Sequence, residues 1–340
     1  MTSAAARAEH LIAHSSRVQT SGRTLTLRCP GCSRVLGSIE YGASSVFEPE
    51  IRCPACGFHL AQEQGIWNAL PPSRQHHYER FLMEYQFVRA AEGRGSPDAA
   101  FYMALPYKDL TGRNPRQWAI RSRTFRYIAH KILPDLQRHT EVPLDVLDLG
   151  AGNGWLSYRL ARRRNFPVAV DISINNRDGL GAAAHYLSEL PTLFPRFQAE
   201  LDNLPFADVQ FDAAIFNASF HYSENYTKTL SEVIRCLRPG GTIIIADSPS
   251  YRTEESGRRM LQERRASFMK HFGFPSDGLN SLEYLTGERL ASLGERLDLS
   301  WQIHQPRYGL RWALRPWLAK IKRNREPSQF RVYTAQVKTK

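Results

Sequence analysis

The pattern of apolar and polar positions changes in character near Leu144. Before that point, apolar residues recur at helical spacing in two segments, 73–91 and 115–133. The second segment begins at Pro115, is expected to end before Pro134, and turns Arg121 outward. Apolar faces of this kind predict helices that pack against a larger body.

From Leu144 onward, short runs rich in β-branched residues alternate with helix-like segments. Alternating strands and helices indicate an α/β fold, in which a mostly parallel sheet carries helices on both faces. Seven runs predict the strands of this sheet, at residues 144–149, 168–171, 196–198, 211–217, 242–246, 297–303 and 330–337.

Four of the five cysteines form two pairs of equal spacing, Cys29-Pro-Gly-Cys32 and Cys53-Pro-Ala-Cys56. Two such knuckles present four thiolates to one centre, which is the tetrahedral ligand set that zinc prefers. A redox dithiol, which needs only one pair, and an iron–sulfur centre are the alternatives. The fifth, Cys236, is expected to be a buried core residue.

Together these patterns predict three regions. Residues 25–70 form a small N-terminal zinc ribbon, residues 71–140 a helical lid or connector, and residues 141–340 the α/β domain.

Composition and charge add one feature to this picture. The chain has 340 residues, of which 42% are hydrophobic and 23% charged, which is ordinary for a globular protein. The net charge is +12, and residues 301–340 hold ten Lys and Arg against the single acid Glu326. Within this region, residues 307–325 interleave seven cations with Trp312, Trp317 and aliphatic residues. This segment has three interpretations: it binds RNA, it lies on an anionic membrane, or it is a cationic flap packed on the core.

No apolar run approaches the roughly 18 residues that a membrane span needs. Charged residues such as Arg7 and Glu9 interrupt the N-terminal segment, which excludes a secretory signal there. A cytoplasmic protein is therefore expected, and peripheral association with a membrane is compatible with this location.

The segment Val146-Leu-Asp-Leu-Gly-Ala-Gly-Asn-Gly-Trp155 carries the strongest chemical pattern. A strand ends here, three glycines follow, and a helix begins, so that the backbone turns sharply and offers free N–H groups to a ligand. The Gly-x-Gly-x-Gly spacing departs from the Gly-x-Gly-x-x-Gly pattern of dinucleotide-binding domains. The upstream Asp148 disfavours a pyrophosphate and suits a cationic ligand.

This segment resembles motif I of class I S-adenosylmethionine-dependent methyltransferases, of the methyltransferase type 11-like group. Three further pieces extend the resemblance in the same order: Asp171 at the end of the second strand, Leu204–Asn217 running into the fourth, and Leu237–Ile245 before the fifth. The resemblance implies a Rossmann-like class I methyltransferase fold and S-adenosyl-L-methionine as cofactor. The cofactor-binding residues that it implies are Asp148, Gly150, Gly152, Gly154, Asp171, Glu200, Leu201, Asp202 and Asn217.

Two details of this implied site stay open. Either Glu200 or Asp202 takes the place of the acid near the adenine amino group, and Glu200 fits the usual spacing slightly better. At the end of the fourth strand, Asn217 is a candidate to orient the methyl acceptor. His221 is either a general base with a pKa near neutrality or a packing residue.

The implied function is methyl transfer to a small-molecule or lipid-like acceptor. An rRNA or tRNA methyltransferase is the first alternative, because the ribbon is similar to that of large-subunit rRNA guanine methyltransferases and the C-terminal segment is basic. Against it, no Asn-Pro-Pro-Tyr-type motif follows the fourth strand. The second alternative is a non-catalytic protein that binds the cofactor and activates a partner.

Overall fold

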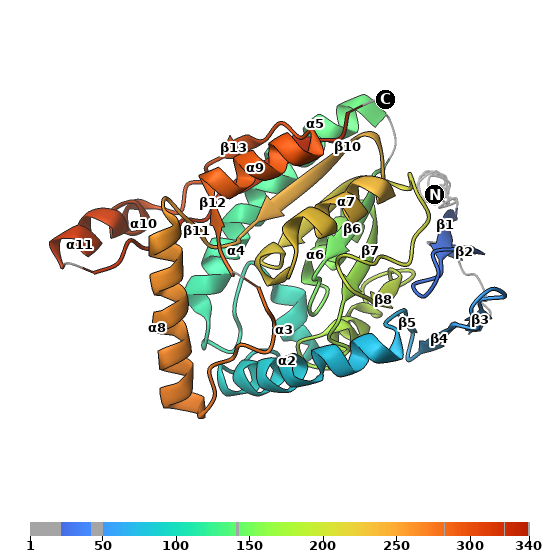
Figure 1. Ribbon diagram of the computed structural model, residues 1–340, viewed down its shortest axis with the longest axis horizontal. Helices are drawn as coiled ribbons and strands as arrows, with labels where there is room; N and C mark the ends of the chain where they lie inside the picture. The colour runs from blue at the N-terminus through green and yellow to red at the C-terminus, as the bar shows by residue number, and fades with distance from the viewer. Residues whose placement is uncertain (1–21, 42–49, 141–142, 282, 323, 339–340) are drawn as a thin grey trace, which may run out of the picture.

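The computed structural model describes residues 22–41, 50–140, 143–281, 283–322 and 324–338. The N-terminal residues on which the prediction about a secretory signal rests lie outside this range. A sheet of ten strands runs through the molecule in the order β13-β14-β10-β9-β6-β7-β8-β5-β4-β3, with helices on both of its faces (Figure 1). The predicted α/β class is therefore confirmed.

Seven of these strands form the sheet that the sequence predicts. β14 is the antiparallel member, pairing with β10 on one side and with β13 on the other, whereas β8, β7, β6, β9 and β10 are parallel. Their bounds are β6 Asp145–Leu149, β7 Phe166–Asp171, β8 Arg196–Gln198, β9 Phe211–Asn217, β10 Leu237–Ala246, β13 Gln302–His304 and β14 Val332–Gln336.

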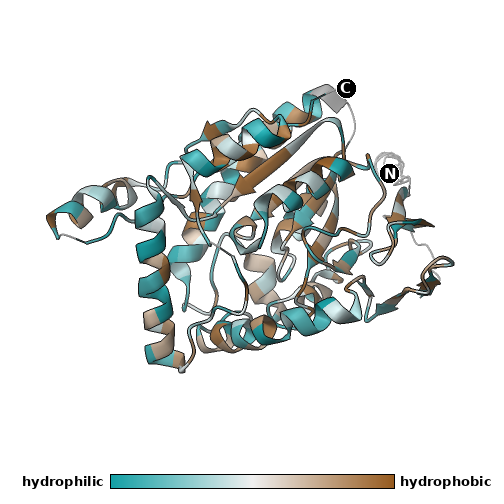
Figure 2. Cartoon of the chain, viewed as in Figure 1, coloured by the Kyte–Doolittle hydropathy of each residue, from teal (hydrophilic) through white to brown (hydrophobic). Residues whose placement is uncertain are grey.

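Successive residues of the central strands enter two different cores, because side chains alternate between the faces of a sheet. Leu147 and Ile245 pack on one face with α7 (Tyr226–Cys236) and α9 (Gly287–Leu297). On the other face, Val146 and Ile244 pack with three elements: α4 (Pro115–Tyr127), α6 (Trp155–Ala161) and the 3-10 helix η2 (Leu180–Tyr186). The central strands are correspondingly hydrophobic along their length, most visibly β10 (Figure 2).

The cysteine-containing region continues the sheet instead of standing apart from it. β5 pairs in parallel with β8, and β4 and β3 add antiparallel strands beyond it. Trp67 in β5 is buried and stacks on Phe197 of β8, with ring centroids 6.3 Å apart. The bounds are β1 Arg23–Arg28, β2 Val35–Tyr41, β3 Glu50–Arg52, β4 His59–Glu63 and β5 Ile66–Asn68.

The β1–β2 hairpin covers a part of the sheet where the sequence leads us to expect a helix. In the described chain, β8 connects to β9 without a helix, and β1 lies against this connection: Arg28 N–H donates to Pro205 O and Ala207 N–H to Thr26 O, both at 3.0 Å. Leu27 is fully buried in the same core as the residues of β6 and β7. The hairpin thus shields apolar strands from water, as a helix does elsewhere on the sheet.

Four helices connect the cysteine region to β6, namely α2 (Pro72–Ala91), α3 (Ala99–Ala104), α4 and α5 (Leu133–Thr140). The prediction that the helix from Pro115 ends before Pro134 is wrong. A π-helical turn at Ile128–Ile132 joins α4 to α5, so the helix widens just before a residue that has no N–H to donate. The proline is thereby accommodated within a continuous helical rod.

After β10, the short strands β11 (Ser250–Tyr251) and β12 (Leu285–Thr286) flank the long helix α8 (Glu254–Phe272). The strand predicted to begin at Leu297 begins instead at Gln302, because Leu297 completes the apolar stripe of α9 and Asp298 ends that helix in a left-handed conformation. No helix among the described residues is long and apolar enough to cross a membrane.

Candidate functional site

The glycine turn after β6 has the geometry that the sequence predicts. Gly150, Gly152 and Gly154 have φ values of 70°, 54° and 74°, in the left-handed region that glycine adopts without strain. A Cβ atom on Gly150 would lie 2.3 Å from the Cβ of Ser219, so a larger residue there would displace the loop after β9. The turn brings the backbone to the edge of a cavity.

This cavity has a volume of about 380 Å³ and lies at the carboxyl ends of β6, β7, β9 and β10. The helices α2, α4 and α8 contribute further lining residues, as do the segment after α8 and Phe330. Figure 1 shows where these three helices lie in the fold. The apolar face predicted for the first helix turns into the cavity and supplies Tyr78, Phe81, Leu82, Tyr85 and Val88. Ligands of open α/β sheets bind at this edge, where the strands end.

Asp171 and Asp148 occupy different positions at this turn. Asp171 lines the cavity, and its carboxylate accepts the N–H of Gly152 and of Ser173, both at 2.8 Å. Asp148 is not among the lining residues. It is buried under α6, where it accepts the N–H of Ser157 at 3.1 Å and the hydroxyl at 2.7 Å. Burial raises the pKa of Asp171 to about 6 and that of Asp148 to about 7.

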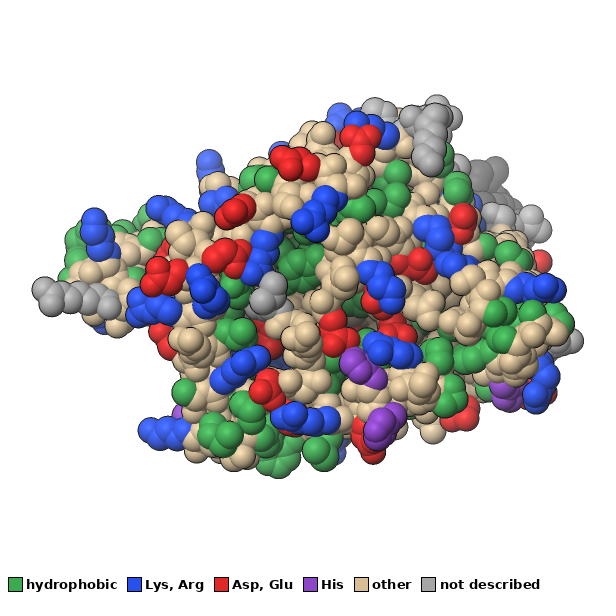
Figure 3. Space-filling model, in the orientation of Figure 1, with side chains coloured by type: hydrophobic (Ala, Val, Ile, Leu, Met, Phe, Trp, Pro, Cys, Tyr) green, Lys and Arg blue, Asp and Glu red, His purple; other side chains and the backbone are tan. Residues whose placement is uncertain are grey.

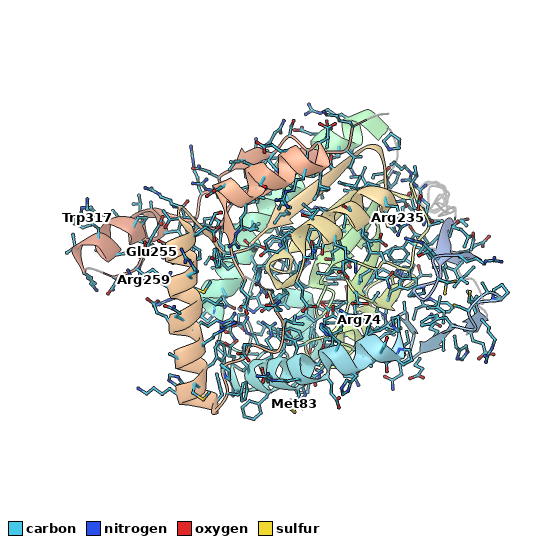
Figure 4. All side chains as sticks on the ribbon, in the orientation of Figure 1. Arg74, Met83, Arg235, Glu255, Arg259 and Trp317 are labelled. Atoms are coloured by element: carbon cyan, nitrogen blue, oxygen red, sulfur yellow. The ribbon has the colours of Figure 1, made fainter. Side chains whose placement is uncertain are left out.

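Of the two acids left open by the sequence, Asp202 faces the cavity. Leu201 and Asp202 line it, and Lys228 lies 3.0 Å from the Asp202 carboxylate. Glu200 points to α2 instead, where it forms a 2.7 Å ion pair with Arg74 and accepts the hydroxyl of Tyr78 at 3.1 Å. Arg74 lies on the length of α2 nearest β5 (Figure 4).

His221 and Asn217 both line the cavity, as expected of residues at the end of β9. The imidazole Nδ1 lies 3.3 Å from the Ser248 hydroxyl. Burial, together with the nearby Arg264 and Arg121, lowers the pKa of His221 to about 3. The expectation of a pKa near neutrality is therefore wrong, and the ring is neutral at physiological pH.

Sequence reasoning missed Asp247, the residue that follows β10. One carboxylate oxygen accepts the Thr124 hydroxyl at 2.6 Å, while the other, Oδ2, makes no hydrogen bond to a described residue. Burial raises the pKa of this carboxyl above its ordinary value. Its place directly after a predicted central strand is the sequence signal that could have identified it.

Arg121 also lines the cavity, whereas the helical pattern placed it on the outer face. Three other arginines of the cavity wall are neutralised: Arg89 pairs with Asp178, Arg94 with Glu92 and Arg264 with Glu283. Arg121 makes no hydrogen bond or ion pair within the part of the chain that the structure describes, and its guanidinium lies 4.9 Å from the Trp118 ring. Its pKa falls to about 10 through burial, so it remains a cation at neutral pH.

The four paired cysteines meet at one point, and none of them lines the cavity. Their sulfur atoms all lie within 4.8 Å of one another, and Cys29–Cys56 and Cys32–Cys53 are each 3.5 Å apart. Gly31 allows this approach, because a Cβ there would lie 3.3 Å from Cys56 Sγ. Cys236 is buried in the sheet core, as expected.

Residues 147–245 match the family model described as "Methyltransferase domain". The match runs from β6 to β10 and includes the glycine turn, Asp171, Asn217 and His221. This match agrees with the resemblance of the region to class I S-adenosylmethionine-dependent methyltransferases.

Among curated proteins, the chain is 28% identical over 106 residues to malonyl-[acyl-carrier protein] O-methyltransferase of Buchnera aphidicola, covering 30% of this chain and 39% of the relative. It is 33% identical over 110 residues to demethylmenaquinone methyltransferase of Thermus thermophilus, covering 32% and 49%. The chain thus spans half or less of the length of these two relatives. Among solved structures, 1,6-didemethyltoxoflavin-N1-methyltransferase of Burkholderia thailandensis aligns with a TM-score of 0.44 at 17% identity, over 86% of this chain and 100% of that one.

The raised pKa of Asp148 gives a measurable pH dependence of stability. The folded state binds this proton more tightly than the unfolded state, whose pKa is near 3.8, so the protonated carboxyl stabilises the fold at low pH. That stability is lost as pH rises from about 4 to about 7. In urea titrations, the free energy of unfolding of the wild type should therefore fall relative to Asp148→Asn across this window, by an amount on the order of a few kcal/mol.

Glu295→Gln, which removes an exposed carboxylate of α9, is the matched control and should track the wild type at every pH. A constant difference between the wild type and Asp148→Asn would contradict the assigned burial.

Proposed function

We propose that the protein is an S-adenosylmethionine-dependent methyltransferase that acts on a small-molecule or lipid-like acceptor with an acidic group. The observation that carries this proposal is the cavity. Its walls contain the glycine turn and Asp171, several apolar side chains, and the cation Arg121, which has no ion-pair partner among the described residues. The cofactor supplies an electrophilic methyl group, and the protein holds the acceptor in line with it.

The residues at the turn fit this cofactor. The Asp171 carboxylate has the acceptor capacity for a pair of ribose hydroxyls and is fixed by two backbone N–H groups. Leu201 and Asp202 offer an apolar contact and an acceptor for the adenine end. The amide nitrogen of Asn217 is buried without a partner among the described residues, and it is available to an oxygen atom in the cavity.

The character of the acceptor follows from the other residues that line the cavity. Phe81, Leu82, Phe268 and Leu279 favour an apolar body. Arg121 favours an anionic group, because a cation in this setting gains most from a carboxylate or phosphate. One relative is named for a quinone, which supports an acceptor with an apolar part, and another for a malonyl group, whose free carboxylate supports an acidic acceptor.

Asp247 is the better candidate base, because His221 is too weakly basic to remove a proton near neutral pH. If the acceptor atom is a hydroxyl, its proton passes to the Asp247 carboxylate, whose Oδ2 makes no hydrogen bond to a described residue while the Asn217 amide lies near it. If the acceptor atom is a carboxylate, it is already ionised and needs no base.

We also propose that the four clustered cysteines hold a structural zinc ion. Four thiolates around one centre, with no fifth ligand needed, form a closed tetrahedral site. His59 lies outside the cluster and pairs with Glu50 at 2.9 Å. The burial of β1, β2 and β5 in the sheet core gives this unit a structural role, so its presence does not call for an RNA substrate.

The purified protein should contain about one zinc per chain by elemental analysis. Cys53→Ser should lose the metal and lower the Tm of the whole chain by about 5 °C or more, since the ribbon and the methyltransferase domain share a core. Cys236→Ala is the control and should keep its zinc. Iron with visible absorbance would overturn the proposal.

Asp171→Ala should weaken the binding of S-adenosylhomocysteine by roughly 10- to 100-fold in calorimetry, through the loss of about 1–3 kcal/mol of hydrogen bonding. Asp202→Asn should also weaken binding, whereas Glu200→Gln should bind nearly as the wild type does because its carboxylate faces Arg74. Equal affinity of the wild type and Asp171→Ala would contradict the assignment of this cavity.

The acceptor class is tested with methyl-labelled cofactor and a lysate from cells that lack the protein. We expect label in the organic or small-molecule fraction, and its loss with Arg121→Ala while the affinity for S-adenosylhomocysteine is kept. Label in a nuclease-sensitive precipitate would make the protein an RNA methyltransferase. Absence of any transfer, with cofactor binding intact, would favour the non-catalytic alternative.

A further inference from the structure

After β13 the chain leaves the body of the molecule in two short helices, α10 (Leu310–Ala313) and α11 (Arg315–Ile321), which project beyond α8 (Figure 1). Pro316 lies in the first turn of α11, where its missing N–H is tolerated. We refer to residues 307–322 as the basic projection.

The basic projection exposes an unusual amount of apolar surface. Leu310 is 84% exposed and Trp317 is 61% exposed, and neither helix contains a buried residue. Trp317 lies at the outer end of the projection, away from the labelled side chains of α8 (Figure 4). The exposed large apolar residues here are Leu310, Leu314, Trp317, Leu318 and Ile321. Apolar residues clustered in this way mark a surface that binds something.

Cations surround these apolar residues, and the projection contains no acidic residue. Arg307, Arg311, Lys320 and Lys322 form no ion pair with any described residue, while Arg315 lies 3.9 Å above the Trp312 ring. Figure 3 shows basic and hydrophobic side chains side by side on this part of the surface. The partner must therefore be both anionic and apolar.

An anionic lipid bilayer meets both requirements better than RNA does. Four of the five exposed apolar side chains are aliphatic, and aliphatic chains neither stack on bases nor bind phosphates. They do enter the boundary between headgroups and acyl chains, while neighbouring Lys and Arg bind anionic headgroups. Trp317 is a residue type that favours the same boundary.

The root of the projection is joined to the cavity. The Tyr308 hydroxyl lies 2.8 Å from that of Thr124, which donates to Asp247. Trp312 stacks on Phe330, a residue of the cavity wall, with ring centroids 5.4 Å apart. A surface bound by the projection therefore lies close to the cavity.

We propose that the basic projection docks the protein on anionic membranes, inserting Leu310, Leu314, Trp317 and Ile321 at the headgroup level. Where the proposed function holds, docking would present the cavity to acceptors that reside in the bilayer. The docking itself needs neither cofactor nor acceptor, so it is tested independently of methyl transfer.

The test is co-sedimentation of the full chain with vesicles of phosphatidylcholine alone or of phosphatidylcholine mixed with phosphatidylglycerol. The wild type should bind the mixed vesicles, bind less as salt rises, and bind the neutral vesicles weakly. Leu310→Gln with Trp317→Gln should reduce partitioning to the mixed vesicles by about tenfold or more, and Arg311→Gln with Lys320→Gln should weaken the salt dependence of the binding.

Matched controls carry the same changes elsewhere on the surface. Leu187→Gln alters an equally exposed apolar residue, and Arg52→Gln with Lys131→Gln removes two exposed cations; both should bind as the wild type does. Failure of the wild type to bind mixed vesicles would overturn the proposal. The proposal would also be overturned if the protein bound single-stranded RNA instead of the mixed vesicles. A dimer in light scattering that is dissociated by Leu310→Gln with Trp317→Gln would overturn it as well.

Discussion

The need to bury both faces of a parallel sheet governs this structure. Parallel strands are apolar on each side, and every stretch left uncovered exposes those side chains to water. Helices meet this need over most of the sheet, but β8 connects to β9 without one in the described chain. The β1–β2 hairpin takes that place, and β5 adds itself to the edge beside β8. The cysteine cluster therefore lies within the unit that covers this part of the sheet, and residues of the N-terminal region belong to the same hydrophobic core as the central strands.

The same parallel arrangement creates the site. Strands that point in one direction bring their carboxyl ends to a single edge, and so Gly150, Asp171, Asn217 and Asp247 meet although they are far apart in the chain. Burial at this edge raises the pKa values of the acids and lowers that of His221. Desolvation thus acts in opposite directions on the two kinds of group: it keeps the imidazole neutral and makes the carboxylates bind their protons more tightly. For this reason Asp247, and not His221, is the candidate base.

Charge is distributed according to environment in this protein. Inside the cavity, arginines are matched by carboxylates, apart from Arg121, because an unpaired charge away from water is costly. On the basic projection, the cations form no ion pair with the described residues, because water solvates them and no packing demands neutrality. The positive charge of the C-terminal region is therefore a surface property, whereas Arg121 is a property of the site.

The sequence by itself determined the fold class, the positions of the central strands along the chain, the glycine turn and the cysteine cluster, because each rests on local patterns: strand periodicity, positive φ angles and fixed ligand spacing. It left open what depends on the direction of a side chain. Only the tertiary structure turned Asp202 and not Glu200 toward the cavity, brought Arg121 inward and carried the helix through Pro134 with a π turn. These outcomes follow from packing between distant elements, such as the pairing of Glu200 with Arg74, which local pattern does not encode.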